Sequence, residues 1–300
     1  MAERGRKFIL WGKRQLKIVA FTLDNYSKLG LNWQAVALSF FSTMAVVPLI
    51  AVIFSITDGF GISNILYDLI HKYFSNQEII NLFLGFANNI LASTDYSLYG
   101  IISFGVFLWL VVWLMLCVER SFNNIWFVET SRVWWKRAMS YFLILLMAPF
   151  VSILFLGMAV VISDGIKNMW MVEIPFLNMR DIIQWLIFYG VAALIFATMF
   201  KFIPNAKVKF SNAFKAALLA SAAFTIVQFF YLETQIFVTR INAVYGVFAA
   251  IPLFMVWVNI GWFIIIIGAQ VSYSIQNLDN YQKEFHWSDL EKLNLLRRRK

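Results

Sequence analysis

Six long apolar segments constrain the fold of this chain more than any other feature of its sequence. Each has more than 20 residues, enough to cross a hydrocarbon layer of about 30 Å as an α-helix that rises about 1.5 Å per residue. The segments are Trp33–Thr57, Leu98–Val118, Met139–Ser163, Ile182–Ile203, Ala213–Val238 and Val244–Ile275. Apolar residues make up 61% of the chain and the mean hydropathy is +0.72, both above the range of soluble domains. We therefore predict an all-α integral membrane protein with six transmembrane helices.

The basic residues predict how this bundle is oriented. Of the 25 Lys and Arg residues, 21 precede the first segment, follow the sixth, or lie in or beside the second-to-third and fourth-to-fifth connections. Because cytoplasmic loops are enriched in Lys and Arg, we expect both termini to be cytoplasmic. The same side chains would contact anionic headgroups of the cytoplasmic leaflet. Since they flank the apolar segments, the net charge of +9 indicates membrane lipids as the partner and no nucleic acid.

We expect a single membrane domain covering residues 1–300. Residues 1–32 are predicted to form a basic, amphipathic cytoplasmic segment, residues 33–275 the six-helix bundle, and residues 276–300 a basic cytoplasmic tail. The first apolar segment is too long for a signal peptide and is expected to act as an uncleaved anchor. The single cysteine, Cys117, excludes a disulfide framework and a thiolate metal site within the chain.

Amphipathic helices are predicted before the first span and in the outer loop between the first and second spans. Within residues 6–28, one apolar stripe recurs at helical spacing, away from most of the basic residues; it consists of Ile9, Leu16, Val19, Leu23 and Tyr26. This pattern is typical of a helix lying on a membrane, although a solvated basic leader is the alternative. In the outer loop, stretches 62–73 and 79–90 show the same periodicity, and we expect both to rest on the outer membrane face or dip into it.

Polar residues inside the fifth segment form one stripe at spacings of four, three, seven and four. They are Ser221, Thr225, Gln228, Gln235 and Thr239. The stripe indicates either a wet pathway or polar contacts between helices, and the sequence leaves both open. Glu233 lies off the stripe near the outer end, and we expect it to pair with Arg240 or to be protonated.

Further candidate residues lie in the second and sixth segments. At the cytoplasmic end of the second segment, Glu119 and Asn123 are predicted to share one helix face and Arg120 and Asn124 another, where they could gate an opening, bind a headgroup or simply cap and anchor the helix. In the sixth segment Asn259 and Gln270 share a face, and Tyr245 near its outer end is also a candidate for substrate contact. A kink or a break of the helix is predicted at Pro48, Gly246 and Pro252.

Soluble-enzyme chemistry has no support in the sequence. His71 and His286 lie on opposite sides of the membrane in the predicted topology, so they cannot share a metal ion. The chain has no Walker A loop, no HExxH and no G-x-S-x-G motif. We expect neither an enzyme nor a bound metal or cofactor.

Several motifs together resemble the YihY/BrkB family of bacterial inner-membrane proteins. They are Ala37–Phe41 with Pro48, Glu119–Trp126, Phe202–Asn205 with Lys207–Val208 and Ala216–Leu218, Tyr245–Ala250 with Trp257, and Gly268–Gln270. The resemblance covers roughly residues 30–277 and implies six helices with both termini inside. Many members have Glu where this chain has Gln270, so a mechanism that needs a titratable carboxylate there does not transfer to this chain.

The resemblance says less about activity. An old "ribonuclease BN" label carried by some members has no support in these residues, whereas others are linked to serum resistance and to export or movement of envelope lipids. We therefore expect a transporter-like protein of the bacterial inner membrane that moves or binds lipid or other amphiphilic envelope components through a polar seam between helices. The alternative is a non-transporting scaffold that recruits envelope-assembly proteins.

Overall fold

The computed structural model describes residues 2–73, 81, 84–85, 98–129, 132–171, 179–241 and 243–281. These residues contain helices and connecting turns but no β-strand. The elements are α1 (Ala2–Lys28), α2 (Leu31–Gly59), α3 (Ser63–Tyr73), α5 (Leu98–Ile125), α6 (Trp134–Met171), α7 (Met179–Phe202), α8 (Phe210–Ile241), α9 (Ala243–Gln276) and the 3-10 turn η1 (Leu278–Asn280). Helices α8 and α9 form a tight hairpin, since α8 ends at Ile241, α9 begins at Ala243 and the two pack against each other.

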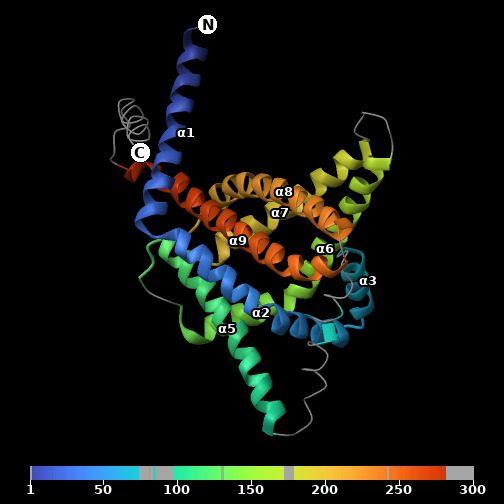
Figure 1. Cartoon of the computed structure of the whole chain (residues 1–300). Helices are drawn as coiled ribbons and strands as arrows, with labels where there is room; N and C mark the ends of the chain where they lie inside the picture. The colour runs from blue at the N-terminus through green and yellow to red at the C-terminus, as the bar shows by residue number, and fades with distance from the viewer. Residues whose placement is uncertain are drawn as a thin grey trace, which may run out of the picture.

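Helix α9 is the centre of the fold. It runs through the middle of Figure 1 with α2 and α8 on its two sides, and it also packs against α1, α5 and α7. Two polar contacts fix it to α2: Asn259 Nδ2 donates to Ser39 Oγ at 2.9 Å and Trp262 Nε1 donates to Ser42 Oγ at 2.8 Å. Inside a membrane the hydrophobic effect does not drive helices together, so such hydrogen bonds help to fix how the two helices are oriented relative to each other.

Small residues let α7, α8 and α9 approach closely. The buried face of α8 contains Ala213, Ala216, Ala217 and Ala220, all at helical spacing. Opposite them, Gly268 of α9 lies so near that a Cβ there would stand 2.8 Å from the Ala220 Cβ. Close backbone approach at small residues is the usual source of packing energy between membrane helices.

A glycine sets the angle between α1 and α2. Gly30 has φ +59° and ψ +39°, a left-handed conformation that residues with a Cβ adopt only at a cost. The two helices meet there at 67°. Figure 1 accordingly shows α1 leaving the bundle at a steep angle to α2. The Gln34 amide Nε2 donates to the Leu29 carbonyl at 3.1 Å and so ties the start of α2 to this turn.

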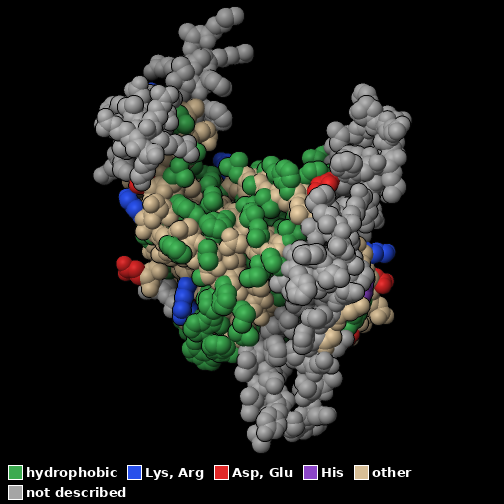
Figure 2. Space-filling view, viewed as in Figure 1, with side chains coloured by type: hydrophobic (Ala, Val, Ile, Leu, Met, Phe, Trp, Pro, Cys, Tyr) green, Lys and Arg blue, Asp and Glu red, His purple; other side chains and the backbone are tan. Residues whose placement is uncertain are grey.

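Four of the described helices are long and apolar enough to cross a membrane. These stretches are Trp134–Leu154, Trp185–Phe202, Phe210–Tyr231 and Pro252–Gln276, and the bent pair Gly12–Lys28 and Leu31–Val46 makes a fifth if it is counted as one span. Figure 2 shows apolar side chains gathered over the middle of the viewed face, with the visible charged side chains towards its edges. The chain is therefore a multi-pass helical membrane protein. The count of six spans and the orientation of the termini stay predictions.

The prediction of a helix break at Pro48, Gly246 and Pro252 is wrong, whereas a kink there stays a prediction. Helix α2 continues through Pro48, and α9 continues from Ala243 through Gly246 and Pro252 to Gln276. Proline removes only its own N–H from the helical pattern, and neighbouring turns and packed helices in membrane proteins tolerate that loss. Helix α6 likewise contains Pro149 without ending there.

The predicted amphipathic segments have mixed outcomes. The first forms helix α1, but the side chains that pack towards the rest of the protein are Ile18, Phe21, Thr22 and Asn25. Val19 and Leu23 of the predicted stripe are exposed, and contact with a membrane stays a prediction. Stretch 62–73 is helix α3, whose Leu66 packs with Phe54 of α2 in a small apolar cluster. Most of stretch 79–90 lies outside the described residues.

Candidate functional site between α2 and α5

The last turns of α5 carry four polar residues on two faces. Glu119 and Asn123 are buried, whereas Arg120 and Asn124 are exposed. Residues four apart share one side of a helix, so the predicted pairing of faces is confirmed. The two faces have different surroundings, and this difference separates structural residues from candidate binding residues.

Glu119 is held by α6. Its Oε2 lies 3.0 Å from Arg137 Nε in an ion pair that lacks hydrogen-bond geometry, while Arg137 Nη2 donates to Oε1 at 3.4 Å. The Tyr141 hydroxyl donates to Oε2 at 2.5 Å. A carboxylate buried this fully needs such partners, because burial without them is costly. Glu119 therefore fixes α6 against α5, and both of its oxygens have partners within the protein.

Asn123 holds the connection between α7 and α8. Its Oδ1 accepts a hydrogen bond of 2.8 Å from the Asn205 backbone N–H. Arg132 Nη2 adds hydrogen bonds to the carbonyl oxygens of Phe202 at 2.6 Å and Pro204 at 3.1 Å. From α9, Gln276 accepts from the Lys209 N–H at 2.8 Å. These contacts give the connection a fixed conformation, so Asn123 is a structural residue in this arrangement.

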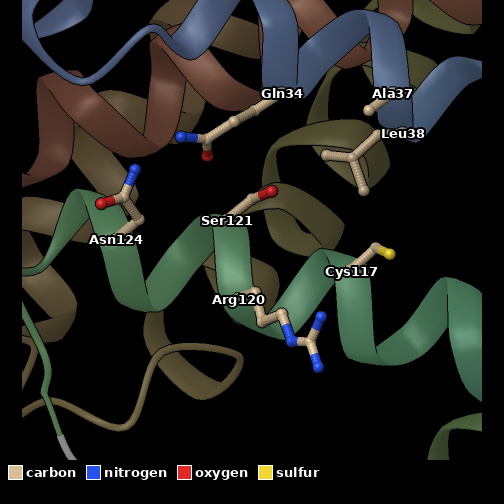
Figure 3. Close-up of a pocket in the computed structure, with 7 residues that line it drawn as sticks. All are labelled: Gln34, Ala37, Leu38, Cys117, Arg120, Ser121 and Asn124. Carbon is tan, nitrogen blue, oxygen red and sulfur yellow. The ribbon is translucent and has the colours of Figure 1, made fainter.

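A pocket of about 320 Å³ lies between α2 and α5. Figure 3 shows Gln34, Ala37 and Leu38 on the α2 side and Cys117, Arg120, Ser121 and Asn124 on the α5 side. Most of the exposed wall is apolar, and among the described residues that line it Arg120 alone is charged. In the close-up the Arg120 side chain extends away from α2 and from Ala37 and Leu38.

Two polar side chains of this pocket, those of Arg120 and Asn124, are available to a ligand. Within the described part of the chain no carboxylate pairs with Arg120, whose guanidinium lies 5.8 Å from the centre of the Trp113 ring. Asn124 is exposed, and its side-chain amide has no hydrogen bond to another described residue. The Gln34 Oε1 is buried and has no hydrogen-bond partner among the described residues. The Arg120 guanidinium and the Asn124 amide are donors, and together with the apolar wall they can bind a molecule with an anionic end and an apolar end.

The polar stripe of α8 faces the protein interior. Ser221 and Gln228 are fully buried, and Trp257 Nε1 of α9 donates to Gln228 Oε1 at 3.2 Å. Ser221 and Thr225 donate to carbonyls of their own helix, at 3.2 and 2.8 Å. The described part of the α8–α9 seam is therefore a packed, hydrogen-bonded contact in this conformation. Gln235 and Thr239 have side chains outside the described residues.

The two candidates of α9 have separate surroundings. Asn259 donates to Ser39 of α2, whereas Gln270 lies fully buried near α1. There Gln270 Nε2 donates to Ser274 Oγ at 3.4 Å, and Thr22 Oγ1 of α1 donates to the same oxygen at 3.1 Å. Gln270 Oε1 has no hydrogen-bond partner among the described residues. These contacts link α9 to α2 and to α1.

The outer-end candidates are only partly described. Glu233 is half-buried in α8. The side chains of Arg240 and Tyr245 lie outside the described residues, so the expected pairing of Glu233 with Arg240 stays a prediction. In the described part of the chain no group of three or more His, Cys, Asp and Glu could hold a metal ion.

Sequence reasoning missed the α2 half of the pocket. Gln34 is a polar residue near the start of an apolar segment, and this is the only signal that could have marked it. Cys117 and Ser121 lie one turn apart on the α5 face that meets α2, but nothing in a single sequence identifies the helix they face.

Comparison with known proteins shows the family. The family model described as "Virulence factor BrkB" matches residues 22–289. The chain belongs to this family. The resemblance inferred from the motifs is confirmed, and the pocket residues of α2 and α5 lie within the matched part of this BrkB-family chain.

Three relatives of this BrkB-family protein are named as membrane proteins. A "UPF0761 membrane protein" of Psychrobacter sp. strain PRwf-1 is 26% identical over 288 residues, which cover 90% of this chain and 50% of that protein. One from Janthinobacterium sp. strain Marseille is 28% identical over 83% of this chain and 57% of its own length. One from Haemophilus influenzae strain 86-028NP is 27% identical over 84% of this chain and 93% of its own length. The chain thus spans about half the length of the first two relatives. No solved structure matches it.

Proposed function

We propose that this BrkB-family protein binds amphiphilic envelope components in the bacterial inner membrane and moves them between leaflets or to a partner. In this proposal six helices cross the membrane, both termini are cytoplasmic, and α1 lies on the inner leaflet. Exposed Val19 and Leu23 would then enter the headgroup region, as in other interfacial helices.

The observation that carries the proposal is the α2–α5 pocket. It combines an apolar wall, formed in part by Ala37 and Leu38, with the charge of Arg120, with which no carboxylate of the described residues pairs. Water-soluble substrates do not need an apolar wall, and purely apolar molecules do not need a guanidinium. The basic residues near this end of α5, among them Arg132 and Lys136, favour the cytoplasmic leaflet as its location.

The candidate residues identified from the sequence have different roles in this proposal. Arg120 and Asn124 would contact the bound molecule at the inner side, while Glu119 and Asn123 would hold the helices that form the site. Glu233, Arg240 and Tyr245 stay candidates for contact at the outer end. Because the seam between α8 and α9 is packed, movement along it would require these helices to separate.

A scaffold function is the second candidate, and the same packed seam favours it. Buried Ser221 and Gln228 already have partners within the protein, as expected for helices that only hold each other in place. A scaffold would recruit envelope-assembly proteins without binding a lipid in the α2–α5 pocket.

Lipid retention distinguishes the two candidates. We would extract the protein gently and record bound lipids by native mass spectrometry for the wild type, Ala37→Trp and Val36→Trp. Ala37 lines the pocket, so an indole there fills it; Val36 is an exposed neighbour outside the lining, so its variant controls for adding a Trp to α2.

The proposal predicts that one lipid class stays bound to the wild type and to Val36→Trp but is lost from Ala37→Trp. The same generic lipid mixture on all three proteins would contradict specific binding in this pocket and leave the scaffold as the better account.

A further inference from the structure

We propose that the α2–α5 pocket selects amphiphiles whose headgroup is an anionic phosphate, with Arg120 as the residue that reads the negative charge. This inference rests on the proposed function and adds the chemical class of the ligand. Asn124 would donate a further hydrogen bond to the phosphate, and the first carbons of the chain would lie on the wall formed by Ala37 and Leu38.

The charge balance of the pocket is positive. Among the described residues that line it Arg120 alone is charged, and the carboxylate beside it in sequence, Glu119, is buried on the other face of α5 with Arg137 as its partner. No described carboxylate therefore neutralises Arg120. A bound anion would meet an uncompensated guanidinium, whereas a cationic headgroup would be repelled by it.

The donors at the pocket suit phosphate. A guanidinium presents N–H groups in a planar fork that two phosphate oxygens can accept from at once. The Asn124 amide, which lies one turn further along the same face of α5, is a further donor. A zwitterionic headgroup also contains a phosphate, but its attached cation would lie near Arg120 and weaken the attraction.

The size and wall of the pocket indicate an amphiphile rather than free phosphate. A volume of about 320 Å³ holds roughly ten non-hydrogen atoms, if each occupies about the 30 Å³ of a water molecule. Inorganic phosphate would fill half of it and leave Ala37 and Leu38 against water. A phosphate with the first few carbons of an acyl or alkyl chain fills the pocket and covers the apolar wall.

The single cysteine supplies a reporter inside the pocket. Cys117 lines it and is the only cysteine of the chain, so intact-mass spectrometry after N-ethylmaleimide treatment measures modification at this position alone. The full-length protein would be placed in phosphatidylcholine nanodiscs, and the modification rate measured with dodecyl phosphate, dodecylphosphocholine or inorganic phosphate below micelle-forming concentrations. The two amphiphiles have the same chain and differ in headgroup charge.

We expect dodecyl phosphate to halve the modification rate at a concentration at least tenfold lower than the concentration of dodecylphosphocholine that does so. This ratio corresponds to a difference of about 1.4 kcal/mol in binding free energy. Inorganic phosphate should leave the rate unchanged. Arg120→Gln should remove the tenfold preference, and Arg120→Lys should keep part of it because the charge remains. Lys136→Gln, which removes an exposed positive charge of α6 outside the lining, should behave as the wild type.

Each alternative result has a defined meaning. Equal protection by both amphiphiles, or an unchanged preference in Arg120→Gln, would overturn the phosphate inference while the proposed function stands. Protection by inorganic phosphate alone would overturn the amphiphile part of the inference. Failure of both amphiphiles to slow modification of the correctly assembled wild type would overturn the proposed function itself.

Discussion

Gly268→Ala should destabilise the helix bundle although it adds only one methyl group. The new Cβ would stand 2.6 Å from Phe200 Cζ, 3.0 Å from Phe200 Cε2 and 2.8 Å from Ala220 Cβ. Carbon atoms in ordinary contact lie about 3.5–4.0 Å apart, so α9 would have to move away from α7 and α8 by about 1 Å.

The surroundings leave the Phe200 ring little room to give way. Phe200 is fully buried, and its ring centre lies 6.1 Å from that of Phe196 and 6.3 Å from that of Phe122. Overpacking in a close-packed interior costs about 1–3 kcal/mol. The higher helix propensity of Ala over Gly, about 1 kcal/mol in water, offsets only part of this. We therefore expect a net loss of up to about 2 kcal/mol.

The assay is the fraction of monodisperse protein that survives heating in detergent. Gly261→Ala is the matched control in the same helix, because its new Cβ would lie 3.8 Å from the nearest neighbour, an ordinary contact. Gly268→Ala should melt several degrees below both the wild type and Gly261→Ala, and adding Phe200→Leu should recover part of the loss by removing the two crowded ring atoms. Equal melting of Gly268→Ala and Gly261→Ala would refute the close approach of α9 to α7 and α8.

Three further substitutions test the surroundings of the site and the turn before it by the same heating assay. Asn123→Ala should lower the stability of the folded protein by about 1–2 kcal/mol, because it removes the acceptor for a backbone N–H of the connection after α7. Asn124→Ala should leave stability unchanged, because this side chain is exposed. Equal effects of the two substitutions would contradict the division of these residues into two faces. Arg137→Gln should destabilise the protein by about 1–3 kcal/mol, because it leaves buried Glu119 without its cation. Adding Glu119→Gln to this variant should recover part of the loss. If the loss of stability in the double variant equals the sum of the two single losses, the two side chains do not interact. Gly30→Ala should cost about 1–2 kcal/mol because φ is +59° there, with Gly30→Asn tolerated better; equal stability of Gly30→Ala and the wild type would show that the turn is not left-handed.

The helices could be predicted from the sequence because their signals are local. Apolar length predicted α8 and α9 almost to their ends, and residue spacing alone separated the face of Glu119 and Asn123 from that of Arg120 and Asn124. The rule used is the helical repeat, which needs no knowledge of any neighbouring helix.

The rest depended on contacts between distant parts of the chain. Periodicity placed Gln34 in an apolar segment but could not show that α2 meets α5 and forms a pocket with it. Pro252 was predicted to interrupt its span, yet α9 continues through it because proline removes one donor without preventing the turns on either side. The stripe of Ser221 and Gln228 was visible in the sequence, but the choice between pathway and packing required their burial and partners.

Movement of lipid by the purified protein tests the central claim most directly. Proteoliposomes would contain a fluorescent phosphatidylglycerol in both leaflets, and dithionite added outside would bleach the outer label. The account predicts that wild-type protein and Val36→Trp bring the inner label within reach of dithionite faster than empty liposomes do, and that Ala37→Trp, with its pocket filled, does so markedly less. Bleaching that stops at the outer leaflet for the wild type, with the protein correctly inserted, would contradict lipid movement by this chain.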